Sequence, residues 1–285
     1  MIGKEELISI FEDTKSLYET DPVLKESVRA SKDGTHIYYE QDMPKLPESK
    51  PCDRTEIKVT QSRSFEAAMR LRKEYPDAKI AVHNFASATN PGGGVTKGSR
   101  AQEECLCRCS TLYPVLNTES NWNGYYGFHR NRHDVRYTDA CIYTPGIMII
   151  KSDTDVPERL PKDDWCEVDV LTCAAPNLRP MPNNPMNPGN DIAVRLSDKE
   201  VLQIHLSRAR HLLQIAAANG DEVLVLGAFG CGAFQNKPEI VAQAYKEVMP
   251  EFEGYFKIVE FAVYCSPRDE SNFVEFKKVL GGSYV

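Results

Sequence analysis

Residues 90–104 read NPGGGVTKGSRAQEE, a glycine-rich loop that runs directly into two adjacent carboxylates. Three consecutive glycines, Gly92, Gly93 and Gly94, expose peptide N–H and C=O groups and can adopt positive φ, so the backbone can approach a ligand closely. Such a loop suits an anion or a sugar. This stretch therefore guides the interpretation of the rest of the chain.

The residues after the loop predict a helix that carries the carboxylate pair in its first turn. Small and apolar residues recur at near-helical spacing from Ala101 to Leu112, and Ser99 with Gln102 fits a Ser-x-x-Gln capping box. The pair itself has two interpretations, because the helix macrodipole favours any acid at this position by about 0.3–1 kcal/mol. A helix start needs at most one glycine, however, and residues 92–98 hold several, so a ligand site is favoured.

A second glycine-rich loop follows a later apolar run. The string DEVLVLGAFGCGAF, residues 221–234, predicts a strand and then a loop whose successive N–H groups can face an anion. The alternative is a tight turn between a strand and a helix. The candidate anion-binding residues are Gly230, Cys231, Gly232 and Ala233, with the aromatic Phe234 next to them.

Alternating strands and helices predict an α/β fold. Nearly continuous apolar runs predict strands at 57–60, 79–85, 141–150, 168–175, 221–229 and 257–265. Helical periodicity predicts helices at 4–18, 64–75, 199–219 and 238–249. Such strands imply a mostly parallel or mixed central sheet with helices on both faces, in three layers. We interpret residues 1–55 as a helical N-terminal extension packed on a domain of residues 56–285, with 41–54 as a connector.

The ligand is expected at one edge of this sheet, because open α/β sheets bind ligands beyond the carboxyl ends of their strands. Three loops are predicted to converge there, after Phe85, after Pro176 and after Phe229. Two further segments, 117–139 and 177–190, carry no regular pattern, and each is interpreted as either a binding lid or an ordinary loop.

Both glycine-rich loops resemble those of a known family. Gly-Gly-Gly followed after seven residues by Gln-Glu-Glu resembles the signature of poly(ADP-ribose) glycohydrolases. The longer string NFASATNPGGGVTKGSRAQEECLCRCSTLY resembles the microbial branch of that family, which is built on a macrodomain. The resemblance continues through LTCAAPN, LGAFGCGAF and FAVYC, and it covers the chain from about Lys58 to the C-terminus. The first fifty residues show no comparable resemblance.

The resemblance implies a role for each residue of the first loop. Glu104 would be the acid that protonates the leaving oxygen or nitrogen and then activates water, as cleavage of a ribosyl bond through an oxocarbenium-like state requires. Neighbouring carboxylates in a desolvated site can keep one of the pair protonated near neutral pH. Glu103 and Asn90 would bind the distal ribose, which Gly92 to Gly94 would let approach the backbone, and Gln102 would belong to the same substrate-binding set.

For the second loop the resemblance implies a phosphate site. Gly230 to Ala233 would hold the pyrophosphate of ADP-ribose, and Phe234 would pack beside the distal ribose, although an aromatic also suits the core. The following Gln-Asn-Lys-Pro, residues 235–238, departs from the family's usual Gly-Asn-Pro-Pro.

Composition excludes several classes of protein. The chain of 285 residues has a formal net charge of −7, which argues against general nucleic-acid binding and means that local donors must hold an anion. No apolar run reaches the roughly 18 residues of a membrane helix. The N-terminus carries early acids and does not look like a signal peptide. We expect a cytoplasmic monomer without membrane contact.

Neither the cysteines nor the histidines indicate a metal. The nine cysteines are odd in number, contain no Cys-x-x-Cys pair and accompany no secretion signal, so neither disulfides nor a zinc site is expected. His83, His129 and His133 are assigned structural or surface roles. No metal or other cofactor is predicted.

The sequence thus predicts an ADP-ribosyl glycohydrolase that releases ADP-ribose from poly(ADP-ribose) or from modified protein side chains. Two alternatives remain: a hydrolase specific for one mono-ADP-ribosyl linkage such as arginine, and a non-catalytic module that binds ADP-ribose. The intact pair of Glu103 and Glu104 argues against the binding module, which needs no acid.

Overall fold

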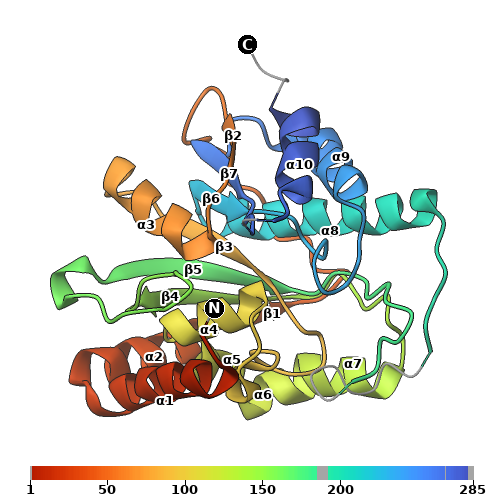
Figure 1. Ribbon diagram of the computed structural model, residues 1–285. Helices are drawn as coiled ribbons and strands as arrows, with labels where there is room; N and C mark the ends of the chain where they lie inside the picture. The colour runs from red at the N-terminus through yellow and green to blue at the C-terminus, as the bar shows by residue number, and fades with distance from the viewer. Residues whose placement is uncertain (1, 185–191, 267, 282–285) are drawn as a thin grey trace.

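The computed structural model describes residues 2–184, 192–266 and 268–281. Its centre is one sheet of seven strands in the order β1-β4-β5-β3-β6-β7-β2 (Figure 1). The strands are β1 (His36–Tyr38), β2 (Glu56–Thr60), β3 (Ile80–Phe85), β4 (Cys141–Ile149), β5 (Cys166–Cys173), β6 (Val223–Leu226) and β7 (Ile258–Ala262). The five strands from β5 to β2 pair in parallel, whereas β4 runs antiparallel to both β5 and β1. The predicted mixed α/β sheet is confirmed.

Helices cover both faces of the sheet. They are α1 (Lys4–Thr20), α2 (Pro22–Gly34), α3 (Ser64–Glu74), α4 (Gln102–Cys109), α5 (Leu112–Leu116), α6 (Glu119–Asn121), α7 (Gly127–Arg132), α8 (Asp198–Ala218), α9 (Pro238–Val248) and α10 (Ser271–Leu280). Short 3-10 turns occupy Val95–Lys97, Lys162–Asp164 and Met249–Phe252, and Trp122–Tyr126 form a π-helix. In Figure 1, α8 to α10 lie on one side of the sheet, and α1, α2 and α4 to α7 lie on the other.

Two apolar cores explain the near-continuous apolar strands. One core joins strand residues such as Leu224 to α8 and α9, and the other joins residues such as Val225 to α3 and α4. Adjacent residues of a strand face opposite sides of the sheet, so a strand covered on both sides is apolar at every position.

The N-terminal helices pack directly behind α4. The hydroxyl of Thr14 donates to the carbonyl of Arg108 at 2.5 Å, and the rings of Phe11 and Tyr113 meet edge to face at 5.1 Å. The buried Lys151 is paired with Asp13 at 2.8 Å. Residues 36–38 also add β1 to the edge of the sheet, a strand that was not predicted. The division at residue 55 stays a prediction.

Two expectations about local structure are wrong or incomplete. Segment 117–139, predicted to be irregular, contains α6, the π-helix and α7. Helices α2, α5 and α10 were not predicted either. Of segment 177–190, residues 177–184 form a loop, and the others lie outside the described residues. Within the described part of the chain, every helix is too short or too polar to span a bilayer.

Candidate active site

Helix α4 begins without the predicted cap. Its N-cap is Ala101, and the Ser99–Gln102 capping box does not form. The Gln102 amide is used elsewhere: it accepts from the backbone N–H of Phe85 at 2.9 Å, and donates to the hydroxyl of Ser64 at 2.9 Å and the carbonyl of His83 at 2.7 Å. Gln102 therefore ties the first turn of α4 to the carboxyl end of β3 and the start of α3.

Glu103 is buried and held by three donors. Its carboxylate accepts from the backbone N–H of Ser87 at 2.8 Å, from that of Gly92 at 3.2 Å and from the Asn84 amide at 3.3 Å. Burial raises the pKa of Glu103 to about 8, while the hydrogen bonds from Ser87, Asn84 and Gly92 act in the opposite direction. This side chain is fixed in place as an acceptor.

The two oxygens of the Glu104 carboxyl have different environments. Oε1 accepts from the backbone N–H of Gly94 at 2.8 Å. Oε2 is buried and has no hydrogen-bond partner among the residues that the structure describes. Burial raises the pKa of Glu104, and the N–H of Gly94 lowers it. A buried carboxyl with one free oxygen favours a bound proton at that oxygen, which is the state a general acid needs.

Glycine is required where the first loop turns over these carboxylates. Gly93 has φ 56°, and a Cβ added to it would lie 2.5 Å from Oε1 of Glu104 and 3.1 Å from Oε2 of Glu103. Gly92 has φ 68°, and its added Cβ would lie 2.7 Å from the ring of Tyr113. The loop can therefore sit on the carboxylates only because these positions lack side chains.

Asn90 closes the same loop. Its amide Nδ2 donates to the carbonyl of Gly93, and its Oδ1 accepts from Nη2 of Arg130 at 3.5 Å. The half-buried Asn90 thus has one side on the glycine turn and the other on α7.

The three loops predicted to converge do contact one another. The N–H of Ala86 donates to the carbonyl of Cys173 at 3.0 Å, joining the ends of β3 and β5. The rings of Phe85 and Phe229 lie 5.8 Å apart, joining β3 and β6. A Cβ added to Gly230 would lie 2.4 Å from that of Ala175, so the loops after β5 and β6 touch.

The second glycine-rich loop presents free peptide N–H groups. The N–H of Cys231 donates to the carbonyl of Ala228 at 3.1 Å. Those of Gly232, Ala233 and Phe234 have no acceptor among the described residues. The Phe234 ring is buried, 6.2 Å from that of Tyr137.

Asn236 holds this loop from behind, a role that the sequence analysis missed. Its buried amide donates to the carbonyl of Pro176 at 2.8 Å and to that of Gly230 at 3.2 Å. Its oxygen is bonded to Nε2 of the buried His205 on α8 at 2.9 Å. The sequence offered one signal for this role, because the asparagine of Gln-Asn-Lys-Pro is also present in the family's usual Gly-Asn-Pro-Pro.

Of the three histidines considered above, His83 and His129 are buried and His133 is exposed. His83 is fully buried between the rings of Phe85 and Phe229, and burial lowers its pKa to about 3. His129 and His133 have the spacing His-x-x-x-His, but His129 is bonded to the carbonyl of Tyr125 and the hydroxyl of Thr138. No group of three potential metal ligands occurs among the described residues, 2–184, 192–266 and 268–281. The nine cysteines are free thiols, and burial raises the pKa of Cys231.

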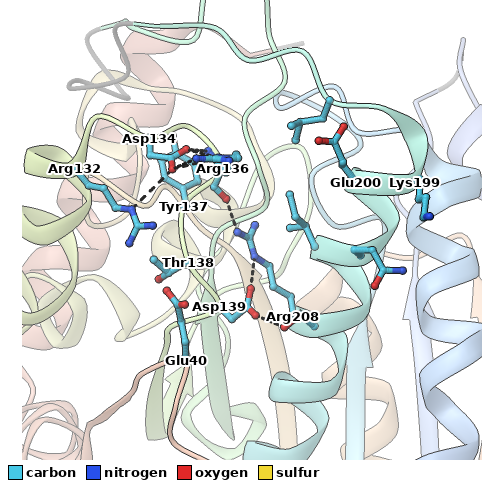
Figure 2. Close-up of a pocket in the computed structure, with 14 residues that line it drawn as sticks. Glu40, Arg132, Asp134, Arg136, Tyr137, Thr138, Asp139, Lys199, Glu200 and Arg208 are labelled. Atoms are coloured by element: carbon cyan, nitrogen blue, oxygen red, sulfur yellow. Dashed lines mark hydrogen bonds and ion pairs between the residues drawn. The ribbon is translucent and has the colours of Figure 1, made fainter.

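A separate cavity of about 580 Å³ lies between α8 and residues 132–139 (Figure 2). Neither Glu103 nor Glu104 lines it. At its base the buried Arg208 donates to the Asp139 carboxylate at 3.1 Å and to the carbonyls of Ala174 and Arg136. Arg132 and Arg136 pair with Asp134 at the cavity wall, and Arg208 pairs with Asp139. The bond from Arg208 to the carbonyl of Arg136 holds the segment that carries Tyr137 beside Phe234.

The sheet and its flanking helices form a macrodomain-like fold, and the matches with known proteins identify a hydrolase that acts on ADP-ribosyl glycosidic bonds. Residues 5–152 match the family model described as microbial-type PARG, catalytic domain, where PARG is poly(ADP-ribose) glycohydrolase. The chain belongs to this family. The match starts at residue 5, so α1 and α2 lie within the family's pattern although their sequence suggested no resemblance.

Solved structures agree with the family assignment. PARG from Thermomonospora curvata is 29% identical, with a TM-score of 0.82 and coverage of 97% of this chain and 100% of that one. The structure of the same protein bound to the inhibitor ADP-HPD is 30% identical, with a TM-score of 0.81 and coverage of 96% of this chain and 99% of that one. PARG from Deinococcus radiodurans in complex with ADP-ribose is 34% identical, with a TM-score of 0.74 and coverage of 89% of this chain and 96% of that one. No curated protein matches this chain.

Proposed function

We propose that this glycohydrolase releases ADP-ribose from poly(ADP-ribose), with Glu104 as its acid and base. The observation that carries this assignment is the asymmetry of the Glu104 carboxyl, which has Oε1 bound to Gly94 and Oε2 buried without a partner among the described residues. The bond to Gly94 orients the group, and the second oxygen can hold the transferable proton.

The reaction then needs two proton transfers by one group. The Glu104 carboxyl gives its proton to the leaving oxygen as the ribosyl C–O bond breaks, and the ribose acquires oxocarbenium character. The resulting carboxylate takes a proton from water as the water oxygen bonds to the anomeric carbon. The product is free ADP-ribose, and the carboxyl is again protonated.

Glu103 has the bonding capacity to orient the ribose. The two carboxyl oxygens have about four lone-pair sites, and Ser87, Gly92 and Asn84 use three. The fourth accepts a hydrogen bond when the carboxyl is ionised, or carries the proton that donates one when it is protonated. One site remains for a ribose hydroxyl. Gln102 is a different case, because its bonds to Ser64, Phe85 and His83 support a positioning role.

The pyrophosphate is proposed to lie on the second loop. The free N–H groups of Gly232, Ala233 and Phe234, with Gly230 and Cys231 before them, can form an anion nest. Such local donors suit a protein whose net charge is −7. The buried bonds of Asn236 keep the loop in shape before the ligand arrives.

Three wider proposals accompany this function. Residues 1–55 act as an extension packed on the glycohydrolase domain of residues 56–285, supported by the bond from Thr14 to Arg108. The protein works as a cytoplasmic monomer, and nine free cysteines suit a reducing compartment. Catalysis needs no metal, since Glu104 can supply the proton.

A substrate panel tests the proposed function. The enzyme is incubated with poly(ADP-ribose) and with arginine-, serine- and glutamate-linked mono-ADP-ribosylated proteins, and free ADP-ribose is measured. We expect release from poly(ADP-ribose). Release from a single mono-linked substrate alone would identify a linkage-specific hydrolase, and binding without any release would identify a reader.

The metal proposal is tested in the same assay. Treatment with EDTA is expected to leave the rate unchanged, because the proposed acid and ribose ligands are all protein groups. A loss of activity that Mg²⁺ restores would contradict this proposal.

A further inference from the structure

Arg130 on α7 reaches the first loop of the active site. Its Nε donates to the carbonyl of Thr89 at 2.6 Å, and its Nη2 donates to Oδ1 of Asn90 at 3.5 Å. The guanidinium lies 4.5 Å from the ring centre of Trp122. Within the described part of the chain it forms no ion pair with a carboxylate, so its contacts are to the loop and to the indole.

The surroundings keep this guanidinium in one orientation. Trp122 opens the π-helix and donates from its indole N–H to Oδ1 of Asn117 at 2.9 Å. An arginine that stacks on an aromatic ring while donating in its own plane loses little further freedom when it binds. π-helices are rare and frequently occur at functional sites.

The hydrogen-bond capacity of Asn90 shows what this orientation achieves. An asparagine amide has two N–H donors and an oxygen with two lone pairs. The carbonyl of Gly93 takes one donor, and Arg130 takes one lone pair. One donor and one lone pair remain, which match a hydroxyl group that both accepts and donates.

We propose that Arg130 is a positioning residue for ribose recognition and acts through Asn90. Together with the carbonyl of Gly93, it fixes which way the Asn90 amide faces, so the remaining donor and acceptor stand ready for one ribose hydroxyl. This inference rests on the proposed function, in which Asn90 binds the distal ribose.

The test compares two ligands that differ in the distal ribose. Calorimetry measures the affinity for ADP-ribose and for ADP, which has the adenosine and pyrophosphate but no distal ribose. Arg130→Ala is expected to bind ADP-ribose about 10-fold more weakly, the size of a lost hydrogen bond, while its ADP affinity stays within about 2-fold. Arg130→Lys is expected to recover little of the loss, because one ammonium cannot serve Thr89 and Asn90 together.

A double variant shows whether Arg130 acts through Asn90. Asn90→Ala is expected to weaken ADP-ribose binding about 10-fold or more, and adding Arg130→Ala should weaken it no further. Arg132→Ala is the control, since this arginine of the same helix lies 5.9 Å from the ring of Phe128 instead. Thermal melting establishes that each variant is folded.

Four results would overturn the inference. Additive losses in the double variant would mean that Arg130 acts independently of Asn90, and an equal loss of ADP affinity would mean a general disturbance. If Asn90→Ala weakens ADP-ribose binding but Arg130→Ala does not, this inference alone fails. If Asn90→Ala binds ADP-ribose like the wild type, the ribose role in the proposed function fails, and this inference fails with it.

Discussion

Gly93 of the first glycine-rich loop and Gly232 of the second differ in why they are glycines, whereas Gly230 of the second loop, with φ 75° and an added Cβ 2.4 Å from that of Ala175, resembles Gly93. In the loop of residues 90–94, Gly93 has φ 56° and faces Glu104 at a distance that leaves no room for a Cβ. In the loop of residues 230–234, Gly232 lies outside the positive-φ region, and an added Cβ would meet no heavy atom within 4 Å. The packing of the protein itself requires glycine at 93 and does not require it at 232.

This difference separates two uses of glycine in one cleft. The first loop brings backbone N–H groups onto Glu103 and Glu104, so its glycines serve the carboxylates. In the second loop, no described residue accepts from the N–H groups of residues 232–234 or lies within 4 Å of a Cβ added to Gly232. An anion that approaches the peptide plane closely would use both the N–H groups and this space, as the proposed pyrophosphate does.

The largest effect is expected from Glu104→Gln, which tests the carboxylate under the first loop. The amide keeps the shape and can still accept from Gly94, but it has no proton to give. Turnover should fall by about 10²–10⁴-fold while ADP-ribose affinity is retained. Steady-state kinetics and calorimetry measure the two quantities.

A matched control separates catalysis from the helix macrodipole. Glu119 also lies in the first turn of a helix, α6, but it is exposed. Glu119→Gln should leave turnover unchanged, because any macrodipole contribution there is about 0.3–1 kcal/mol of stability. Near-normal turnover in Glu104→Gln would remove Glu104 from the mechanism.

The next largest effect is expected from Gly232→Glu in the second loop. The new side chain has room in the folded protein but puts a carboxylate where the pyrophosphate is proposed to lie. Like charges in contact cost several kcal/mol, so ADP-ribose affinity should fall by about 100-fold or more. Calorimetry measures the affinity, and the melting temperature should stay close to the wild-type value. A folded variant with full affinity would exclude this loop from the site.

A smaller loss of activity is expected from Gly93→Ala. The methyl group would press on both carboxylates, and turnover should fall by about 10- to 100-fold as they are displaced. Gly220→Ala is the control: Gly220 has φ 78° but nothing within 4 Å of an added Cβ. Gly220→Ala should lose about 1–2 kcal/mol of stability from the left-handed backbone and Gly93→Ala at least as much, but only Gly93→Ala should lose turnover. Equal turnover in the two variants would show that crowding of the carboxylates is unimportant.

The sequence predicted the strands and the convergence of three loops because both depend on short-range apolar patterns. The apolar runs around Ile80 and Val223 mark strands buried on both faces. Parallel strands end at the same edge, so the loops after β3, β5 and β6 had to meet. The family signature then directed attention to Glu103 and Glu104.

Some of the wrong or missed predictions concern side chains that bond to residues distant in sequence instead of to their neighbours. Ser99 and Gln102 fit a capping box, but the Gln102 amide finds Ser64 and the end of β3 instead. The π-helix at Trp122–Tyr126 breaks the 3.6-residue period by which helices are recognised. The bond between His205 and Asn236 joins residues far apart in sequence, and no local pattern announces it. A missed signal was Asp21 before Pro22, which caps α2 through the N–H of Val23 at 2.9 Å.

The smallest effect is expected from Gly232→Ala, and its small size makes the comparison of the loops sharper. A methyl group at this position meets no atom of the described residues within 4 Å and requires no unusual φ, so the folded state should accept it with less than about 0.5 kcal/mol of change. If the pyrophosphate binds through the N–H groups alone, a methyl group directed away from them should change ADP-ribose affinity by less than about 2-fold. If the phosphate oxygens pack against the Cα itself, the methyl group takes their place and affinity falls, while Gly232→Glu still weakens binding more. Calorimetry on this variant therefore measures how closely the ligand approaches the backbone. A loss of stability without ligand would instead show that the protein needs glycine at 232 for its own turn, and the distinction between the two loops would be wrong.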